Sequence, residues 1–103
     1  MSLLLEFSMF PTDTGESKSE SVARSIDIIK KSGLPYQMGP MGTVIEGEWD
    51  EVMKVVKLCF DEMQKNSNRV FTGLKIDYRK GKSGRIKSKI ESIEKRLDTM
   101  GKS

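Results

Sequence analysis

The chain has 103 residues, 36% of them hydrophobic and 32% charged, which is enough for one small domain with a modest core. It contains no histidine and one cysteine, Cys59. These counts exclude catalysis by histidine, an internal disulfide and zinc sites built from cysteine or histidine clusters. A single cysteine fits a reducing compartment, and the early apolar run 3–5 is too short for a signal peptide or a membrane span. We therefore expect a cytoplasmic protein that does not enter a membrane.

The net charge of +3 is divided unevenly along the chain. Residues 1–78 carry 9 basic and 12 acidic side chains (net −3), whereas residues 79–103 carry 9 basic and 3 acidic ones (net +6). The segment 79–89 is the most basic, and such a cluster is able to bind phosphate or nucleic acid. A solvated, lysine-rich helix face explains it more simply, and no aromatic residue follows Tyr78 to stack on bases.

Residues 3–10 predict a strand, because their side chains alternate between two faces and Pro11 follows. One face carries Leu3, Leu5, Phe7 and Met9, and the other carries Leu4, Glu6, Ser8 and Phe10. The first set suits a core, and the second places polar groups inside a strand.

A helix is expected next, over residues 17–32. Ser17 and Glu20 have the spacing of a capping box, and Gly33 stands where a helix often ends. The residues expected to face the core are Val22, Ala23, Ile26 and Ile29. Residues 34–47 then predict a hairpin, with strands over 34–38 and 43–46 around the turn 39–42.

The second half of the chain predicts a helix, a strand and a further helix. Residues 48–66 have helical spacing, with an apolar stripe of Trp49, Val52, Met53, Val56, Cys59, Phe60 and Met63. Cys59 lies on that stripe and is interpreted as an inert core thiol. Residues 69–79 alternate as a strand, with Lys75 and Asp77 on one face. The last helix runs over about 83–100 before Gly101, and its narrow stripe of Ile86, Ile90, Ile93 and Leu97 suits a partner groove or a packed seam.

This order of elements predicts an α+β fold: one ferredoxin-like βαββαβ sandwich over residues 1–103, with an extra C-terminal helix. The first strand should then be central, between the second hairpin strand and the last strand. Glu6 and Lys75 are candidates for a cross-strand pair. The sheet face without the two main helices must be covered by the last helix or by another subunit, or else it is a binding surface.

The common catalytic and nucleotide-binding motifs are absent: we find no Walker loop, dinucleotide glycine pattern, nucleophile elbow or EF-hand. The glycines of the turn 39–42 are explained by a tight hairpin. Glu46 and Glu48 share a face at spacing two, and we interpret them as a solvated strand end. We therefore expect no catalytic residues, no metal and no cofactor.

Three stretches carry a resemblance to a known family: residues 37–49 (QMGPMGTVIEGEW), the opening strand 6–11 (EFSMFP) and residues 74–79 (LKIDYR). Together they resemble the YkoF-like thiamine-binding family over nearly the whole chain. The resemblance implies a ferredoxin-like subunit that assembles into homodimers and commonly homotetramers. It also implies binding of thiamine, or of its hydroxymethylpyrimidine part, without catalysis.

An aminopyrimidine needs an acceptor for its amine, donors for its ring nitrogens and an apolar or sulfur-rich surface to lie on. On the matching stretches, the residues suited to these roles are Glu46 or Asp77 as acceptor, Ser8 and Thr43 as donors, and Phe10, Met38 or Met41 as packing surface. Thr43 and Glu46 point to opposite faces of an ideal strand, so both serve one ligand only if a bulge follows Gly42.

Two other classes of function remain open at this point. One is binding of nucleic acid or polyphosphate through the basic segment 79–89. The other is a structural or regulatory interaction module that uses the stripe from Ile86 to Leu97 as its contact. An enzyme is the least supported class, because without histidine it would need a carboxylate, Lys75 or Cys59 in a perturbed environment.

Overall fold

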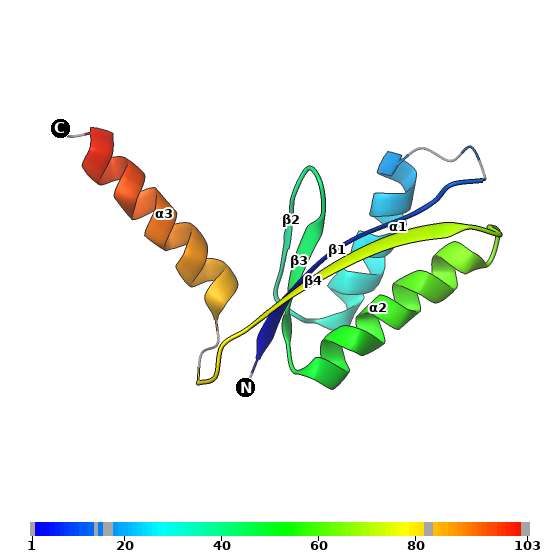
Figure 1. Cartoon of the computed structure of the whole chain (residues 1–103), viewed down its shortest axis with the longest axis horizontal. Coiled ribbons are helices and arrows are strands. Elements are labelled where there is room, and N and C mark those ends of the chain that lie inside the picture. The colour runs from blue at the N-terminus through cyan, green and yellow to red at the C-terminus, as the bar shows by residue number, and fades with distance from the viewer. Residues whose placement is uncertain (1, 14, 16–17, 82–83, 102–103) are drawn as a thin grey trace.

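We describe the protein from a computed structural model, which places residues 2–13, 15, 18–81 and 84–101 (Figure 1). The elements are β1 (Leu3–Pro11), α1 (Lys18–Ser32), β2 (Tyr36–Met38), β3 (Thr43–Gly47), α2 (Trp49–Gln64), β4 (Val70–Tyr78) and α3 (Arg85–Gly101). The four strands form one antiparallel sheet in the order β2-β3-β1-β4. Helices α1 and α2 cover one face of this sheet, and α3 stands apart from them. This is the predicted ferredoxin-like sandwich with an additional C-terminal helix.

Strand β1 is central, as predicted, and its register fixes which side chains share a face. Phe7 lies opposite Thr43 of β3, and Leu4 lies opposite both Glu46 of β3 and Asp77 of β4. Thr43 therefore belongs to the face that α1 and α2 cover, whereas Glu46 and Asp77 belong to the open face. The predicted opposition of Thr43 and Glu46 is confirmed.

The core lies between the sheet and the two helices. Its fully enclosed members come from all of these elements: Leu5, Ile29, Ile45, Val52, Cys59 and Met63. Most of this core was predicted, but the helix faces were not assigned correctly. The structure corrects both of them.

On α1 the buried residues are Ser21, Ser25 and Ile29, at a regular spacing of four. Val22, which we expected in the core, is exposed, as is Ala23. The prediction was wrong because it counted apolar residues, and here two serines occupy core-facing positions. Small side chains at these positions let α1 pack close to its neighbours.

On α2 the buried residues are Val52, Val55, Cys59 and Met63. Val55 was missed, whereas Trp49 and Phe60 were predicted to be buried and are exposed. The apolar arc of α2 is wider than the strip that contacts the core, so the residues at its borders remain in solvent.

The element boundaries follow local backbone chemistry. Gly33 has φ +77°, a conformation that glycine adopts without strain, and it ends α1 as predicted. Strand β2 begins at residue 36 and not at 34, because Pro35 lacks the N–H that a strand residue donates. Helix α2 begins after Glu48, which forms a capping box with Glu51. The predicted helix starts at Ser17 and Ser83 fall outside the described residues.

Helix α3 leads away from the sandwich and contacts the sheet at its first turn (Figure 1). The Cα radius of gyration is 15.6 Å, compared with about 13 Å for a compact domain of this length. Most of the predicted stripe of α3 is exposed, including Ile90, Ile93 and Leu97. The described part of one chain thus leaves this helix and much of the open sheet face uncovered.

Candidate functional site

A pocket lies where β1 continues past the end of β3. Strand β3 begins at Thr43, opposite Phe7, so β1 is paired on one side alone, with β4, from Ser8 onward. The turn 39–42 closes this gap and α1 forms its floor. We call this space the loop pocket; it has a volume of about 260 Å³ and is lined by Phe7, Ser8, Met9, Phe10, Val22, Ser25, Gly39, Pro40, Met41, Gly42 and Thr43.

The loop pocket brings together four of the seven candidate site residues. Ser8 and Phe10 come from β1, Met41 from the turn and Thr43 from the start of β3. The Phe10 ring is held against the ring of Phe71, with 5.5 Å between their centroids. Met41 is 90% exposed and forms the outer lip of the pocket. By the register of β1, Ser8 and Phe10 lie on the open face and Thr43 lies on the covered face, so the pocket at the edge of β1 is bordered from both faces of the sheet.

Ser25, which the sequence analysis missed, lines the same pocket from α1. Ser25 is 6% exposed. Its hydroxyl group is buried and has no hydrogen-bond partner in the part of the chain that the structure describes. A buried polar group without a partner is costly, so it marks a place where a ligand would supply the missing bond. The signal that could have revealed Ser25 is its spacing of four from Ser21 and from Ile29.

Met38 lies beside the loop pocket and does not line it. It borders a shallow groove that runs between α1 and the turn, together with Ala23, Ile26 and Pro40. Its side chain is more than half exposed. A ligand in the loop pocket would reach Met38 at its outer end, past Gly39 and Pro40, which line both spaces.

Glu46 is buried on the open face of the sheet and binds the start of α3. Its carboxylate accepts hydrogen bonds from the backbone N–H of Arg85 at 3.0 Å and of Ile86 at 3.4 Å, and from the Ser2 hydroxyl at 3.1 Å. A carboxylate at this position neutralises the partial positive charge of the helix N-terminus. The expectation of a solvated strand end is therefore wrong for Glu46, which is 4% exposed, and Glu48 caps α2.

Asp77 secures the same end of α3 from the neighbouring strand. Its Oδ2 atom lies 2.7 Å from the Lys89 ammonium and 2.6 Å from the Arg85 guanidinium, which also donates to the Asp77 carbonyl at 3.2 Å. The hydrogen bonds from Lys89 and then Arg85 lower the pKa of the Asp77 carboxyl below its usual value. Glu46 and Asp77 together fix α3 to the sheet.

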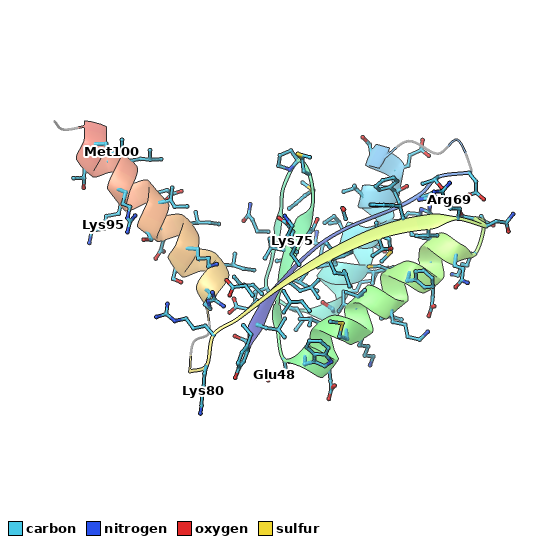
Figure 2. All side chains as sticks on the ribbon, in the orientation of Figure 1. Glu48, Arg69, Lys75, Lys80, Lys95 and Met100 are labelled. Carbon is cyan, nitrogen blue, oxygen red and sulfur yellow. The ribbon has the colours of Figure 1, made fainter. Side chains whose placement is uncertain are left out.

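A second space, which we call the sheet–helix pocket, lies between the open face and α3. Its volume is about 360 Å³, and it is lined by Leu4, Glu6, Gln37, Val44, Lys75, Ile76, Asp77, Ile86, Lys89 and Ile90. Glu6 and Lys75 lie directly opposite each other on β1 and β4, as predicted, and Lys75 projects from β4 in Figure 2. Among the described residues, however, neither forms an ion pair. Of the seven candidate residues, this pocket contains Asp77.

Comparison with known proteins places this architecture in a family. Residues 5–94 match the family described as Thiamine-binding protein. The chain belongs to the thiamine-binding protein family. It is 38% identical over 98 residues to a UPF0045 protein of Mycobacterium bovis, covering 94% of this chain and 96% of that one. It is 36% identical over 91 residues to a UPF0045 protein of Methanocaldococcus jannaschii, covering 88% and 91%.

Solved structures agree with this assignment. The Methanocaldococcus jannaschii protein MJ1052, described as hypothetical, superposes with a TM-score of 0.81 at 35% identity, covering 90% of this chain and 96% of that one. A Thermotoga maritima protein named as a candidate for thiamine biosynthesis or salvage superposes with a TM-score of 0.78 at 27% identity, covering 90% and 99%. The resemblance noted in the sequence is confirmed.

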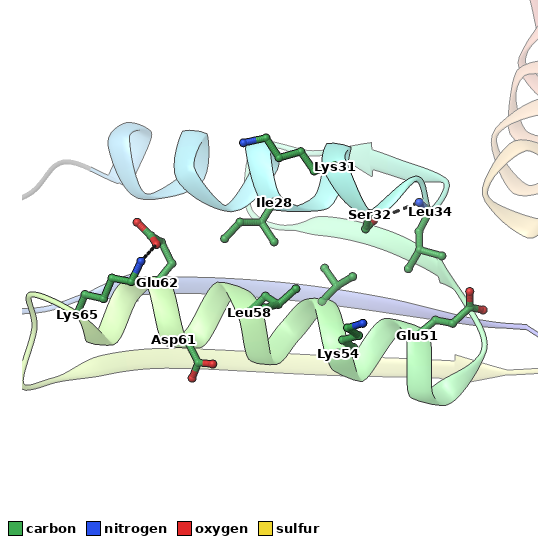
Figure 3. A pocket seen from close by; sticks show the side chains of 11 residues that line it. Ile28, Lys31, Ser32, Leu34, Glu51, Lys54, Leu58, Asp61, Glu62 and Lys65 are labelled. Atoms are coloured by element: carbon green, nitrogen blue, oxygen red, sulfur yellow. Dashed lines mark hydrogen bonds and ion pairs between the residues drawn. The ribbon is translucent and has the colours of Figure 1, made fainter.

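This thiamine-binding family member has a further, wider hollow on the outside of its helices. The hollow has a volume of about 610 Å³ and lies between α1 and α2 over Ile28, Leu34 and Leu58 (Figure 3). Charged side chains line its rim, and Lys65, directly after the end of α2, pairs with Glu62 at 2.8 Å. No candidate site residue lines it. It is an open groove between two helix surfaces, and we give it less weight than the loop pocket.

Two further observations concern metal binding and thiol chemistry in the part of the chain that the structure describes. No group of three or more histidine, cysteine, aspartate or glutamate side chains among them is placed to hold a metal ion. Burial raises the pKa of the Cys59 thiol to about 11, so this cysteine is not a nucleophile at neutral pH. No helix among these residues is both long and apolar enough to cross a membrane.

Proposed function

We propose that this protein binds thiamine, or its hydroxymethylpyrimidine part, in the loop pocket, and that it does so without catalysing a reaction. Two observations support this: membership of the thiamine-binding protein family, and the convergence of Ser8, Phe10, Met41 and Thr43 on one pocket. The observation that carries the proposal is the second, because an aminopyrimidine needs a surface to lie on and hydrogen-bond donors for its ring nitrogens, and these residues supply both.

The chemistry of the pocket suits such a ligand. Phe10 and Met41 supply an aromatic face and a polarizable thioether on which a flat ring can lie. Thr43 on the covered face and Ser8 on the open face each supply a hydroxyl group at the edge of β1 that can donate to a ring nitrogen. Met38 lies at the outer end and would contact a larger ligand. In this proposal Glu46 and Asp77 act indirectly, by holding α3.

We further propose that the chain acts as one domain in the cytoplasm and that it assembles as a homodimer or homotetramer. The exposed stripe of α3 and the open sheet face leave apolar surface that a second copy would cover. The edge strand β4 adds to this surface, with Leu74, Ile76 and Tyr78 each more than two-fifths exposed.

The nucleic-acid alternative has less support. Within the basic segment, Arg85 and Lys89 are paired with Asp77, and the N-terminus of α3 is occupied by Glu46. The charges that would remain for phosphate are fewer than the sequence suggests. A protein that neutralises few phosphates binds nucleic acid weakly and with a shallow salt dependence.

Isothermal titration calorimetry with thiamine and with hydroxymethylpyrimidine tests the proposed function. We expect saturable binding of at least one of them to the full chain. Circular dichroism on the same sample shows whether the protein is folded. Absence of heat with folded protein at millimolar ligand would falsify the proposal, and retention of DNA or RNA in a gel shift at low salt would favour the alternative.

A further inference from the structure

Inside the loop pocket, the edge of β1 on the side of β3 is not paired with any strand that the structure describes. Backbone groups of alternate residues in an antiparallel strand project to the same side. The Thr12 N–H donates to the Arg69 carbonyl on the β4 side at 3.0 Å, and the Phe7 carbonyl lies on the opposite side, where a Cβ on Gly42 would approach it to 3.2 Å. Met9 alternates with Phe7, so its N–H and C=O project to the side of β3, beyond the point where β3 begins.

Met9 therefore presents one donor and one acceptor side by side to the pocket that it lines. No described strand residue lies opposite it on this side, because the β1–β3 pairing stops at Phe7 and Thr43. Strand edges with unpaired N–H and C=O groups readily take up a partner with the matching pattern. The turn 39–42 lines the other side of this space, which has a volume of about 260 Å³.

We propose that the backbone of Met9 and the hydroxyl group of Ser25 together recognise the aminopyrimidine ring by hydrogen bonds. The ring's exocyclic amine donates to the Met9 carbonyl, the adjacent ring nitrogen accepts from the Met9 N–H, and the Ser25 hydroxyl bonds a further polar atom of the ligand. This inference rests on the proposed function and specifies how the ligand is selected.

The donor and acceptor pattern decides the selectivity. In a 4-aminopyrimidine, an N–H donor stands beside a ring-nitrogen acceptor, which is the complement of the C=O and N–H of one strand residue. In the 4-oxo analogue the two roles are exchanged. That analogue could pair with Met9 only by turning over, which would carry its hydroxymethyl arm to the other side of the pocket. A ligand that leaves a polar group of a buried site without a hydrogen bond binds much more weakly.

Ser25 gives the ring a second fixed point. Its hydroxyl is enclosed and without a partner among the described residues, and it lies on the face of α1 that floors the pocket. A serine side chain has three staggered rotamers, so the hydroxyl can turn to meet a ligand atom. The pocket volume of about 260 Å³ lies just below the range of about 300–1,000 Å³ for drug-sized ligands, which suits a single ring.

The first test compares ligands on the unaltered full chain. Calorimetric titrations are made with hydroxymethylpyrimidine and with its 4-oxo analogue. We expect hydroxymethylpyrimidine to bind at least about ten times more tightly than its 4-oxo analogue, since one good hydrogen bond contributes a factor of about this size to the affinity. Equal affinity for the two compounds overturns the inference and leaves the proposed function intact. No binding of either compound, or of thiamine, overturns both.

The second test uses Ser25→Ala with Thr72→Val as the matched control. Thr72 also has a buried hydroxyl without a partner in the described part of the chain, but it lies on β4 and does not line the loop pocket. Ser25→Ala should weaken hydroxymethylpyrimidine binding about fivefold to tenfold, while leaving the melting temperature of the free protein equal or higher. Thr72→Val should leave the affinity unchanged. Unchanged affinity in Ser25→Ala contradicts the role of Ser25, as does an equal loss in both variants.

The third test observes Met9 directly, because a backbone group cannot be removed by a side-chain substitution. In ¹⁵N-labelled protein, added hydroxymethylpyrimidine should shift the Met9 amide resonance and slow its exchange with solvent. The amide of Phe10, which points to β4, serves as the internal control and should change far less. Binding that leaves the Met9 amide unaffected overturns the proposed strand-edge contact.

Discussion

The Oε2 atom of Glu46 lies 3.0 Å from the backbone nitrogen of Arg85, which is 39 residues later in the chain. This contact joins the middle of the sheet to the first turn of the C-terminal helix. The carboxylate is enclosed, and three donors surround it: two backbone N–H groups and the Ser2 hydroxyl. Glu46 of β3 thus caps the N-terminus of α3, although the two elements are far apart in the sequence.

Glu46→Ala should destabilise the protein by about 1–2 kcal/mol, because it removes a helix cap and leaves the N–H groups of Arg85 and Ile86 without their acceptor. Urea denaturation followed by circular dichroism measures this change, and hydrogen exchange should show faster exchange of α3 amides. Glu6→Ala is the control: Glu6 lies on the same sheet face, exposed and without an ion pair among the described residues. Equal effects of the two substitutions would show that the cap contributes nothing.

The ion pairs of Asp77 should make the stability of the fold depend on pH in the acid range. Hydrogen bonds from Lys89 and Arg85 lower the pKa of its carboxyl below the usual 3.8. A group whose pKa is lower in the folded state stabilises the fold above its unfolded pKa, and this contribution is lost as the pH falls through the folded pKa. The stability difference between the wild type and Asp77→Asn should therefore be constant from pH 7 to about pH 5 and disappear below the lowered pKa.

Thermal denaturation of both proteins between pH 2 and pH 7 measures this difference. Asp98→Asn is the control, since Asp98 is an exposed residue farther along α3 and has no ion pair in the described residues. It should have little effect at any pH. A difference between wild type and Asp77→Asn that persists at pH 2 would contradict the assignment.

The sequence predicted the fold well because the fold depends on periodic patterns. Alternation in 3–10 and 69–79 predicted the strands, and the element order predicted the central place of β1 and the position of Glu6 opposite Lys75. Helix faces were less predictable. Ser21 and Ser25 occupy core-facing positions that apolar periodicity does not detect, because the pattern records hydrophobicity and not the space available beside the helix.

The sequence grouped the candidate site residues by their chemistry, and the structure brings only some of them to one pocket. Ser8, Phe10, Met41 and Thr43 line one pocket because the turn 39–42 lies beside the edge of β1 where its pairing with β3 ends, and this register could not be fixed from the sequence. The partners of Glu46 and Asp77 depend on where α3 returns to the sheet, and that is set by contacts between residues far apart in the chain. Their capping and pairing roles could not be read from spacing alone.

Met41→Ala should weaken ligand binding several-fold without affecting stability. Met41 is 90% exposed in the free protein, so its side chain adds little to folding, but it forms the lip of the loop pocket. Calorimetric titration with hydroxymethylpyrimidine and a thermal melt give the two quantities. Met100→Ala, at an exposed methionine near the end of α3, is the control and should change neither. Unaltered affinity in Met41→Ala would remove this lip from the site.

Cys59 should be unreactive in the folded protein. Burial is the main cause that raises the pKa of its thiol to about 11, and the hydrogen bond to the Ser25 carbonyl at 3.9 Å acts weakly in the other direction. A thiol-specific chromogenic disulfide at pH 8 should react fully in denaturant and very slowly without it. Since the folded pKa exceeds the unfolded value, the thiol's contribution to stability should be lost as the pH rises from about 9 to 11. Fast reaction in the native protein would contradict the buried position.

The stripe of α3 should determine assembly. Ile93 and Leu97 are each about three-fifths exposed on a helix that leaves the sandwich, an arrangement that a single small domain rarely keeps in water. We expect light scattering to give the mass of a dimer or tetramer for the wild type and a smaller mass for Ile93→Glu with Leu97→Glu, because charges in an apolar contact are costly. The control places the same acidic groups on the other side of α3, as Lys95→Glu with Thr99→Glu, and should keep the wild-type mass. If the stripe variant also keeps that mass, assembly must use the open sheet face or the β4 edge instead.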